Sequence, residues 1–176
     1  MKWDMTEQDF RQAFADHKDS VYGFALRMTG SPAAAEDLAQ ECFLELLRHA
    51  GRFDSRRGPL RAWLLGVTRN LALRHLRVEQ RLDPIEIEDE LPAPAPDWKT
   101  AGISMLIGAA VQSLPPLQRE AVLLFEYEGF TLEEIAAIVD ADIGTVKSRL
   151  HRARERLRHI LAPLRNGSGG SGNAAR

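Results

Sequence analysis

Four prolines within thirteen residues divide this 176-residue chain into two parts. They are Pro84, Pro92, Pro94 and Pro96. Prolines spaced in this way forbid a helix and favour an extended, semi-rigid spacer. The surrounding residues 83–104 carry a charge of −5, on a chain whose net charge is only −2. We therefore expect a linker at 83–99 between a first domain at 1–82 and a second at 100–165, followed by a flexible Gly/Ser-rich tail at 166–176.

Apolar residues recur with helical spacing on both sides of this linker, and strand-like alternation is almost absent. The spacing predicts helices over 6–28, 32–49, 100–113, 116–128, 131–139 and 143–162, and a helix of roughly twenty residues that begins at Gly58-Pro59 and ends before Pro84. Two starts are well marked. Ser31 and Pro32 form an N-cap and a first helical position, and Thr131 with Glu134 forms a capping box. The predicted fold class is all-α, as two small helical domains.

Several protein classes are disfavoured by the sequence. No apolar run approaches the roughly eighteen residues of a membrane span, and the N-terminus lacks a signal-peptide pattern, so we expect a cytoplasmic protein. The one cysteine, Cys42, falls on an apolar helix side and is expected in the core. The sequence contains no phosphate-binding Gly loop, no metal-spaced His/Cys set and no nucleophile motif. We expect no catalysis, no cofactor and no bound metal.

Two basic stretches stand out on this mildly acidic chain. Residues 48–81 hold nine arginines against Asp54 and Glu79, and residues 143–165 hold six arginines and a lysine against Glu155. Such clusters are typical of surfaces that bind nucleic acid. The sequence predicts two separate electrostatic footprints, one in each domain.

The helix predicted at 32–49 has two sides of different chemistry. Its apolar side consists of Ala35, Leu38, Ala39, Cys42, Phe43 and Leu46. Its other side presents Asp37, Gln40, Glu41, Leu44 and Arg48 at intervals of three and four residues. From the spacing alone this second side is either an ordinary solvated surface or a docking surface.

The helix predicted to begin at Gly58-Pro59 and to end before Pro84 carries an apolar and a basic stripe. The expected core residues are Leu60, Leu64, Val67, Leu71 and Val78. Beside them run Trp63, Asn70, Arg74, Arg77 and Arg81. A tryptophan next to arginines can stack on bases while the arginines contact phosphates. The alternative is that Trp63 packs in the core and the arginines are solvated.

Residues 131–158 have the pattern of a helix-turn-helix. A short capped helix is followed by a turn at 140–142, where Asp140 must take the left-handed conformation that Gly usually supplies. Asp142 is the expected N-cap of a second helix with Ile143, Val146, Leu150 and Ala153 on its core side. The exposed basic side of such a helix can enter the major groove of DNA. The alternative is a basic amphipathic helix in a bundle.

Four stretches in this order resemble one family. They are AAAEDLAQECFLELLRH (33–49), RAWLLGVTRNLALRHLR (61–77), LPPLQREAVLLFEYEGFTLEEIA (114–136) and GTVKSRLHRARERLR (144–158). Together they resemble the extracytoplasmic-function (ECF) sigma factors, the small two-domain members of the bacterial sigma-70 family. The resemblance covers most of residues 10–165.

The resemblance implies a role for each matching residue. The positions that dock on the clamp helices of the polymerase β′ subunit are matched by Asp37, Gln40, Glu41 and Leu44. The positions that capture and hold the −10 element are matched by Arg52, Phe53, Arg56, Arg57, Trp63, Arg69, Asn70 and Arg74. The recognition-helix positions that read the −35 element are matched by Thr145, Lys147, Ser148, Arg149, His151, Arg152 and Arg156.

These matches imply a transcription initiation factor without enzymatic activity. It would bind core RNA polymerase through the β′ clamp helices and the β subunit, bind promoter DNA and help to melt it, and be held by an anti-sigma factor. Two other classes stay open. A helix-turn-helix regulator acting without sigma function should carry a β/α receiver domain in its N-terminal half. The first 82 residues show no pattern of such a domain. A helical interaction protein would use the polar side at 37–48 alone.

Overall fold

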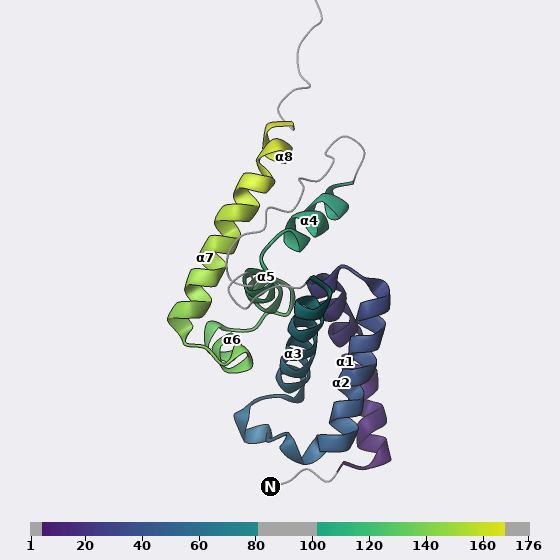
Figure 1. Cartoon of the computed structure of the whole chain (residues 1–176). Helices are drawn as coiled ribbons and strands as arrows, with labels where there is room; N and C mark the ends of the chain where they lie inside the picture. The colour runs from purple at the N-terminus through teal and green to yellow at the C-terminus, as the bar shows by residue number, and fades with distance from the viewer. Residues whose placement is uncertain (1–4, 81–101, 168–176) are drawn as a thin grey trace, which may run out of the picture.

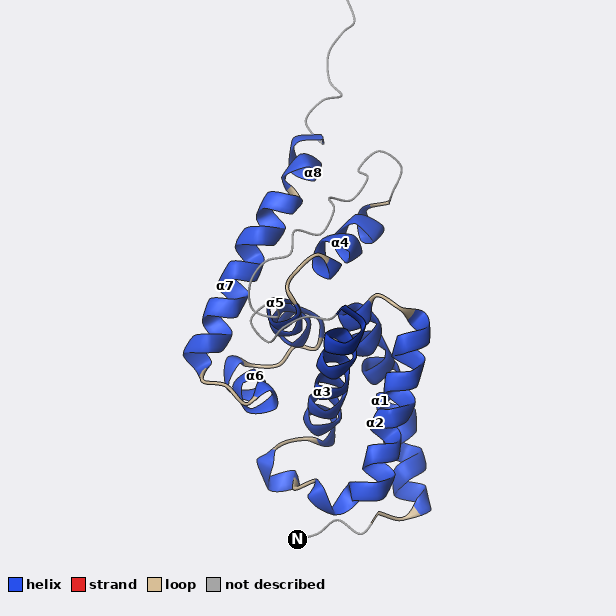
Figure 2. Cartoon of the chain, viewed as in Figure 1, coloured by secondary structure: helices blue, strands red, loops and turns tan. Residues whose placement is uncertain are grey.

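The computed structural model describes residues 5–80 and 102–167 of the chain. Over these residues every regular element is helical, as Figure 2 shows, and this confirms the predicted all-α fold class. The linker predicted at 83–99 and the tail from residue 168 lie outside the described residues.

The helices fall into a first group before the gap and a second group after it (Figure 1). The first group contains α1 (Glu7–Thr29), α2 (Pro32–His49), two short 3-10 turns η1 (Ala50–Arg52) and η2 (Ser55–Arg57), and α3 (Leu60–Gln80). The second contains α4 (Ile103–Gln112), α5 (Pro116–Val122), the π-helical turn η3 (Leu123–Tyr127), α6 (Leu132–Val139), α7 (Ile143–Ile160) and α8 (Ala162–Gly167).

The helix ends follow from local side-chain chemistry. Thr6 and Asp9 form a reciprocal capping box at the start of α1, which ends at Gly30 in the left-handed conformation with φ 72°. The Ser31 hydroxyl accepts a hydrogen bond from the Ala34 N–H, with Pro32 in the first turn of α2. The predicted boundaries of α1 and α2 are confirmed.

The first group is a bundle of three helices whose apolar sides meet. Its largest fully buried side chains are Phe24, Met28, Leu46, Leu64, Leu65 and Leu76. Cys42 is buried among them with its Sγ 3.4 Å from the Leu64 carbonyl oxygen. Burial raises the pKa of this thiol to about 11, so the predicted core role is confirmed.

One expected core residue of α3 lies outside the core. Val78 is 75% exposed, while Leu76 is fully buried. A seven-residue spacing drifts by about 20° per repeat on a straight helix. After Leu64 and Leu71 the next step therefore passes the contact stripe, which continues through Leu76.

The helix-turn-helix is formed as predicted. Thr131 and Glu134 cap α6, Asp140 takes φ 53° and ψ 54°, and the Asp142 carboxylate accepts from the Thr145 N–H at the start of α7. Ile143 was expected on the core side and is 37% exposed, because it opens the first turn of α7, before the contact with α5 and α6 is established.

The helix predicted at 116–128 differs in its second half. After Val122 the main chain widens into one π turn. At its end the Glu128 N–H donates a hydrogen bond to the Leu123 carbonyl oxygen, with N and O 3.0 Å apart. Single π turns of this kind often accompany functional sites. Here the turn leads to Gly129, whose φ of 72° reverses the chain ahead of α6.

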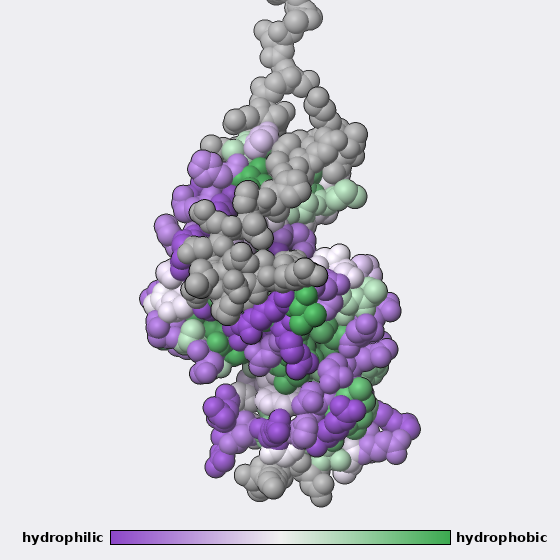
Figure 3. All heavy atoms as spheres, in the orientation of Figure 1, coloured by the Kyte–Doolittle hydropathy of each residue, from purple (hydrophilic) through white to green (hydrophobic). Residues whose placement is uncertain are grey.

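The two groups share one continuous apolar cluster. α3 packs against α6, and α1 packs against α4 and α5, so that the second group lies along one side of the bundle (Figure 1). The space-filling view in Figure 3 shows a mainly hydrophilic face with smaller hydrophobic patches between the polar residues. This arrangement determines which of the predicted site residues can be reached from solvent.

Candidate nucleic-acid and partner interfaces

The polar side of α2 is accessible in the structure. Asp37, Gln40 and Leu44 are exposed and Glu41 is half-buried. Arg48 lies beside Glu41, with its Nη1 4.0 Å from Oε1. The opposite side of α2 supplies the buried contacts of the bundle, so these outer residues are not needed for the core.

An apolar groove of about 540 Å³ lies beside this polar side, between α1 and α2. Its apolar walls are Phe10, Phe14, Tyr22, Phe43, Leu44 and Leu47. The Phe14 and Phe43 rings meet edge to face with centroids 4.9 Å apart, and Leu47 is 50% exposed. Of the predicted polymerase-binding residues, Gln40 and Leu44 line this groove, and Leu44 is the one apolar residue among them. Leu47 follows it by three residues on the outer side of the helix, and that apolar pair was the available signal.

Five of the eight residues predicted for the −10 element line a second pocket, of about 360 Å³. They are Arg52, Phe53, Arg57, Trp63 and Asn70. The Phe53 and Trp63 rings meet at 72° with centroids 6.4 Å apart. The pocket therefore combines aromatic faces, basic groups and an exposed amide from the loop and from α3.

The other three residues of that set lie apart from the pocket. Arg56 is exposed and pairs with Asp54, its Nη2 2.8 Å from Oδ2, and hydrogen bonds from Arg56 lower the pKa of Asp54 to about 2. Arg74 is exposed further along α3. Arg69 turns away from solvent toward the second group of helices, and its side chain is only 14% exposed.

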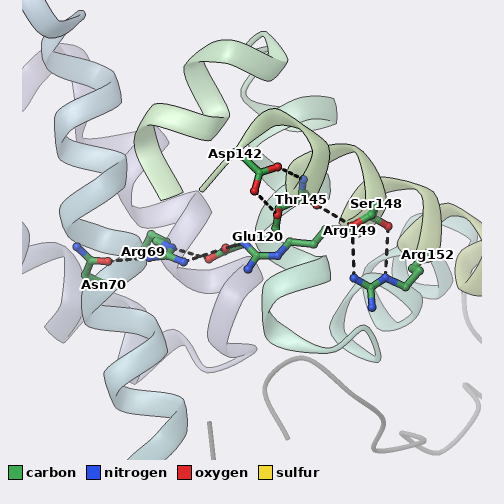
Figure 4. A network of polar contacts seen from close by, with 8 residues as sticks. All are labelled: Arg69, Asn70, Glu120, Asp142, Thr145, Ser148, Arg149 and Arg152. Carbon is green, nitrogen blue, oxygen red and sulfur yellow. Dashed lines mark hydrogen bonds and ion pairs between the residues drawn. The ribbon is translucent and has the colours of Figure 1, made fainter. Parts of the chain in front are cut away.

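The recognition-helix candidates divide in a similar way. Lys147, Ser148, His151 and Arg152 are exposed on α7, whereas Thr145 and Arg156 are half-buried. The Arg152 guanidinium rests against its own helix, with Nη2 3.4 Å from the Ser148 hydroxyl. Arg149 points inward and its side chain is 11% exposed, so in this conformation it does not lie with the exposed basic residues (Figure 4).

Both inward-turned arginines end on the same residue, Glu120 of α5 (Figure 4). Arg69 binds both carboxylate oxygens, with Nε 2.6 Å from Oε2 and Nη2 3.0 Å from Oε1. Arg149 Nη1 lies 3.3 Å from Oε1. Burial raises the pKa of the fully buried Glu120 carboxyl, and Arg69 and Arg149 oppose that rise.

The sequence analysis missed Glu120. Its only signal was an Arg-Glu pair inside the apolar run LQREAVLLF, where two charged residues cannot both face solvent if the helix is packed on several sides. A buried carboxylate requires a partner, but the sequence does not say which arginine supplies it.

The described residues contain neither a candidate metal site nor a candidate membrane span. Within 5–80 and 102–167, no three His, Cys, Asp or Glu side chains are grouped so as to hold a metal ion. None of the helices described there combines the length and apolarity required to cross a bilayer.

Comparison with protein families gives two matches in the order of the two helix groups. The model of Sigma-70 region 2 matches residues 13–82, and that of Sigma-70, region 4 matches residues 104–157. The first match ends, and the second begins, close to the gap in the described chain.

Among curated proteins, the chain is 37% identical over 155 residues to the ECF RNA polymerase sigma factor SigE of Mycolicibacterium smegmatis, and the aligned part is 83% of this chain and 59% of that relative. It is 35% identical over 166 residues to the RNA polymerase sigma factor CarQ of Myxococcus xanthus, which covers 92% of this chain and 94% of CarQ. The chain thus spans well under two thirds of SigE but nearly all of CarQ.

Two solved structures share the fold. The sigma factor RpoE of Bartonella quintana, solved in complex with the anti-sigma factor NepR, matches with a TM-score of 0.70 and 30% identity, over 88% of this chain and 98% of that one. CnrH, solved in complex with the cytosolic domain of CnrY, matches with a TM-score of 0.66 at 21% identity, over 90% of each chain, and supports the fold alone.

Proposed function

This chain belongs to the ECF sigma factors of the sigma-70 family, and from that premise we propose how its separate surfaces act in transcription initiation. As an RNA polymerase sigma factor it binds core polymerase, directs the enzyme to promoters and assists their melting. One observation carries this conclusion, which is that regions 2 and 4 of the family occur in order on one chain. The proposed domain limits are 1–82 and 100–165, with a linker at 83–99.

We place the polymerase contact on the outer side of α2. Asp37, Gln40 and Glu41 supply polar groups there, and Leu44 joins them to the apolar groove. A helix of the partner can set an apolar side chain between Phe14 and Leu47 while its polar groups meet the carboxylates. Among the described residues, those that line the groove belong to α1 and α2, so the groove is available without any movement of the second helix group.

Promoter melting would use the pocket between the η1–η2 loop and α3. Unstacking a base costs a few kcal/mol, which the protein must offset by binding the flipped base. Trp63 and Phe53 offer faces for stacking, and Asn70 offers a donor and an acceptor for a base edge. Arg52 and Arg57, with Arg56, Arg69 and Arg74 around them, would meet the phosphates of the same strand.

Recognition of the −35 element would use α7. Its exposed residues Lys147, Ser148, His151 and Arg152 stand on one side of a helix that is held by Val146, Leu150 and Ala153 on the other. A helix held in this way can place its N-terminal half in the major groove. Thr145 and Arg156 would contribute contacts at its edges, and Arg149 would join them only after release from Glu120.

The remaining assignments follow from the same role. The factor would act by binding alone, without catalysing a reaction, in the bacterial cytoplasm where polymerase and promoters are found. The structure of RpoE with the anti-sigma factor NepR supports an anti-sigma protein as a further partner. A helix-turn-helix regulator without sigma function is disfavoured, since region 2 would have no use in it.

Transcription in vitro with purified core polymerase tests this function. Core enzyme plus this chain is expected to start at a defined set of sites on genomic DNA, and core enzyme alone is not. A pull-down should recover the chain with core polymerase at equal stoichiometry. Failure to bind core polymerase would contradict the proposal, and tight binding without promoter-specific starts would favour the interaction-protein alternative.

A further inference from the structure

The η1–η2 loop contributes a carboxylate to the pocket proposed for the −10 element. Asp54 is half-buried there and lines the pocket together with Phe53, Trp63 and Asn70. The other carboxylate of the lining, Glu134, belongs to the capping box of α6. A carboxylate repels the phosphates of DNA, so Asp54 is suited to contact a base and not the backbone.

The orientation of the Asp54 carboxylate is fixed by Arg56, two residues along the chain. The Arg56 main-chain N–H donates to Oδ1, with N and O 3.1 Å apart. The side chain donates from Nε to Oδ1 at 2.9 Å and from Nη2 to Oδ2 at 2.8 Å. An ionised carboxylate has about four acceptor positions, and Arg56 thus takes about three of them. The position that is left for a ligand lies on Oδ2.

Asp54 can use this position only as an acceptor. Hydrogen bonds from the Arg56 side chain and main chain lower the pKa of Asp54 to about 2, so the carboxyl is ionised at neutral pH. An ionised carboxylate accepts hydrogen bonds and cannot donate one. A carbonyl oxygen of a base placed beside it would therefore face a charged acceptor with no hydrogen between the two atoms.

Asn70 of α3 supplies a donor to the same pocket. Its Oδ1 accepts a hydrogen bond from Arg69 Nη1 at 3.0 Å (Figure 4). Because an arginine side chain can only donate, the amide turns its oxygen toward Arg69, and its NH₂ group is left to donate elsewhere. The pocket therefore combines an acceptor on the loop, a donor on α3 and the aromatic rings of Phe53 and Trp63.

We propose that the pocket selects a base with an exocyclic amino group, cytosine or adenine, through a hydrogen bond from that group to Asp54. The proposal rests on the function assigned above to this pocket. In both bases the amino group lies next to an unprotonated ring nitrogen, which can accept a hydrogen bond from Asn70. Thymine and guanine carry a keto oxygen in place of the amino group and a protonated nitrogen beside it. Neither contact can form with those two bases.

Arg56 acts here as a positioning residue for Asp54. The side chain uses its Nε and Nη2 for Asp54, and its other N–H groups can still reach a phosphate. Asp54 also caps η2, because it accepts from the Arg56 main-chain N–H. A residue that served only as this cap would have no influence on which base is bound, so the base preference distinguishes the two roles.

Base substitution in the −10 strand tests this selection in the assembled holoenzyme. The probe is the single strand of a −10 element, taken from a promoter that core polymerase and this chain use in vitro. At each position in turn, cytosine is replaced by uracil or adenine by hypoxanthine, which exchanges the amino group for a keto group and changes the size of the base very little. We expect one position at which the exchange weakens binding about tenfold in competition titrations.

Variants of the full-length chain assign this preference to Asp54. Asp54→Asn can still cap η2, but it is uncharged and can turn its NH₂ group toward a keto oxygen, so the preference should fall to about threefold or less. Asp16→Asn is the matched control, since it removes the same charge from an exposed site of α1 outside the pocket and should leave the preference unchanged.

A second pair of variants tests the positioning role. Arg56→Ala keeps the Asp54 carboxylate but removes the side chain that orients it, so the preference for the amino base should fall here as well. Arg57→Ala removes the neighbouring arginine and keeps the Asp54–Arg56 pair. It should weaken the binding of both strands alike and leave their ratio unchanged.

Three results would overturn the base selection. One is that no position of the strand prefers the amino base, and another is that the preference is equal in wild type and Asp54→Asn. Should Asp54→Asn fold poorly, an unchanged preference in Arg56→Ala would overturn it in the same way. In each case the proposed function stands, because the wild-type holoenzyme has already supplied the promoter. If the wild type gives no promoter-specific starts, the proposed function itself fails, and the base selection fails with it.

Discussion

The Nε of Arg69 lies 2.6 Å from Oε2 of Glu120, and this ion pair joins α3 to α5 across the boundary between the two helix groups. Glu120 has no exposed surface and Arg69 is only 14% exposed, so water cannot replace the arginine as the partner of the carboxylate. Removing one member of such a pair leaves an uncompensated buried charge.

Glu120→Ala is therefore expected to lower the free energy of unfolding by about 3–5 kcal/mol, because Arg69 and Arg149 both lose their carboxylate. Urea denaturation followed by circular dichroism measures the loss. Glu126→Ala removes an exposed carboxylate from a pair with Arg154 and should cost less than about 1 kcal/mol. Equal losses in the two variants would show that the Glu120 network does not stabilise the fold.

Alanine at Asp37, Gln40 and Glu41 together should leave the free energy of unfolding within about 0.5 kcal/mol of wild type per site, since these side chains lie on the outer side of α2. Binding to core polymerase should fall sharply in the same protein. Alanine at Glu7, Gln12 and Asp16 of α1 removes the same two acids and one amide from exposed positions outside the groove, and serves as control. Full polymerase affinity in the first triple variant would show that the outer side of α2 is an ordinary solvated surface and not a docking surface.

Trp63→Ala should weaken binding of a −10 single strand by about 1–3 kcal/mol, the range for one stacked base. Trp63 packs against Phe53 at the pocket edge, so Trp63→Phe keeps a stacking face and should retain part of the affinity. Permanganate reactivity of unpaired thymines in polymerase complexes measures the effect on melting. An unchanged melted region in Trp63→Ala would show that Trp63 packs in the core and does not stack on a base, which is the alternative given by the sequence.

Arg152 and Lys147 are both exposed on α7 but are expected to differ in effect. If Arg152 reads a base edge, Arg152→Ala should cost about 1–3 kcal/mol and relax specificity at one position of the −35 element. If Lys147 meets only phosphate, Lys147→Ala should weaken binding to all sequences and reduce the salt slope by about one. Holoenzyme titrations on cognate and scrambled −35 fragments distinguish the two, and an equal loss on both fragments would exclude Arg152 as a reader.

The start of α7 should be sensitive to acid. Hydrogen bonds from the Thr145 N–H and hydroxyl lower the pKa of Asp142 below its ordinary value of 3.8. A carboxyl whose pKa is lowered by folding stabilises the folded state above the unfolded pKa, and that stabilisation is lost as the pH falls through the lowered value. Asp142→Asn can still cap the helix and has no such titration. The difference in unfolding free energy between wild type and Asp142→Asn should thus shrink as the pH is lowered from 6 to 3. Urea denaturation at each pH measures this difference. A difference that stays constant over this range would contradict the prediction.

The fold was largely predictable because its helix ends are encoded locally. Each N-cap side chain accepts a hydrogen bond from a main-chain N–H within three residues, and such contacts can be inferred from neighbouring residues in the sequence. The N-caps are Thr6, Ser31, Thr131 and Asp142. The left-handed Asp140 was predictable for the same reason. The prediction that Val78 lies in the core was wrong, because a seven-residue spacing drifts by about 20° per repeat and the position after Leu64 and Leu71 passes the contact stripe.

The site was predictable only as a set of surfaces. Resemblance to the family supplied Trp63, Asn70 and the exposed residues of α7. It could not supply the inward orientation of Arg69 and Arg149, because both depend on Glu120, a residue of another helix. The π turn at Leu123–Tyr127 was missed for a related reason, since the apolar run there fits an α-helix equally well.

The apolar cluster that runs through both helix groups makes the contact between them dependent on temperature. Separating α3 from α6 exposes apolar side chains to water, and exposure of this kind raises the heat capacity. The hydrophobic part of the contact weakens on cooling, whereas ion pairs such as Arg69–Glu120 follow a different temperature dependence. The free energy of the contact between the two helix groups is therefore a curved function of temperature, and the contact should weaken on strong cooling as well as on heating.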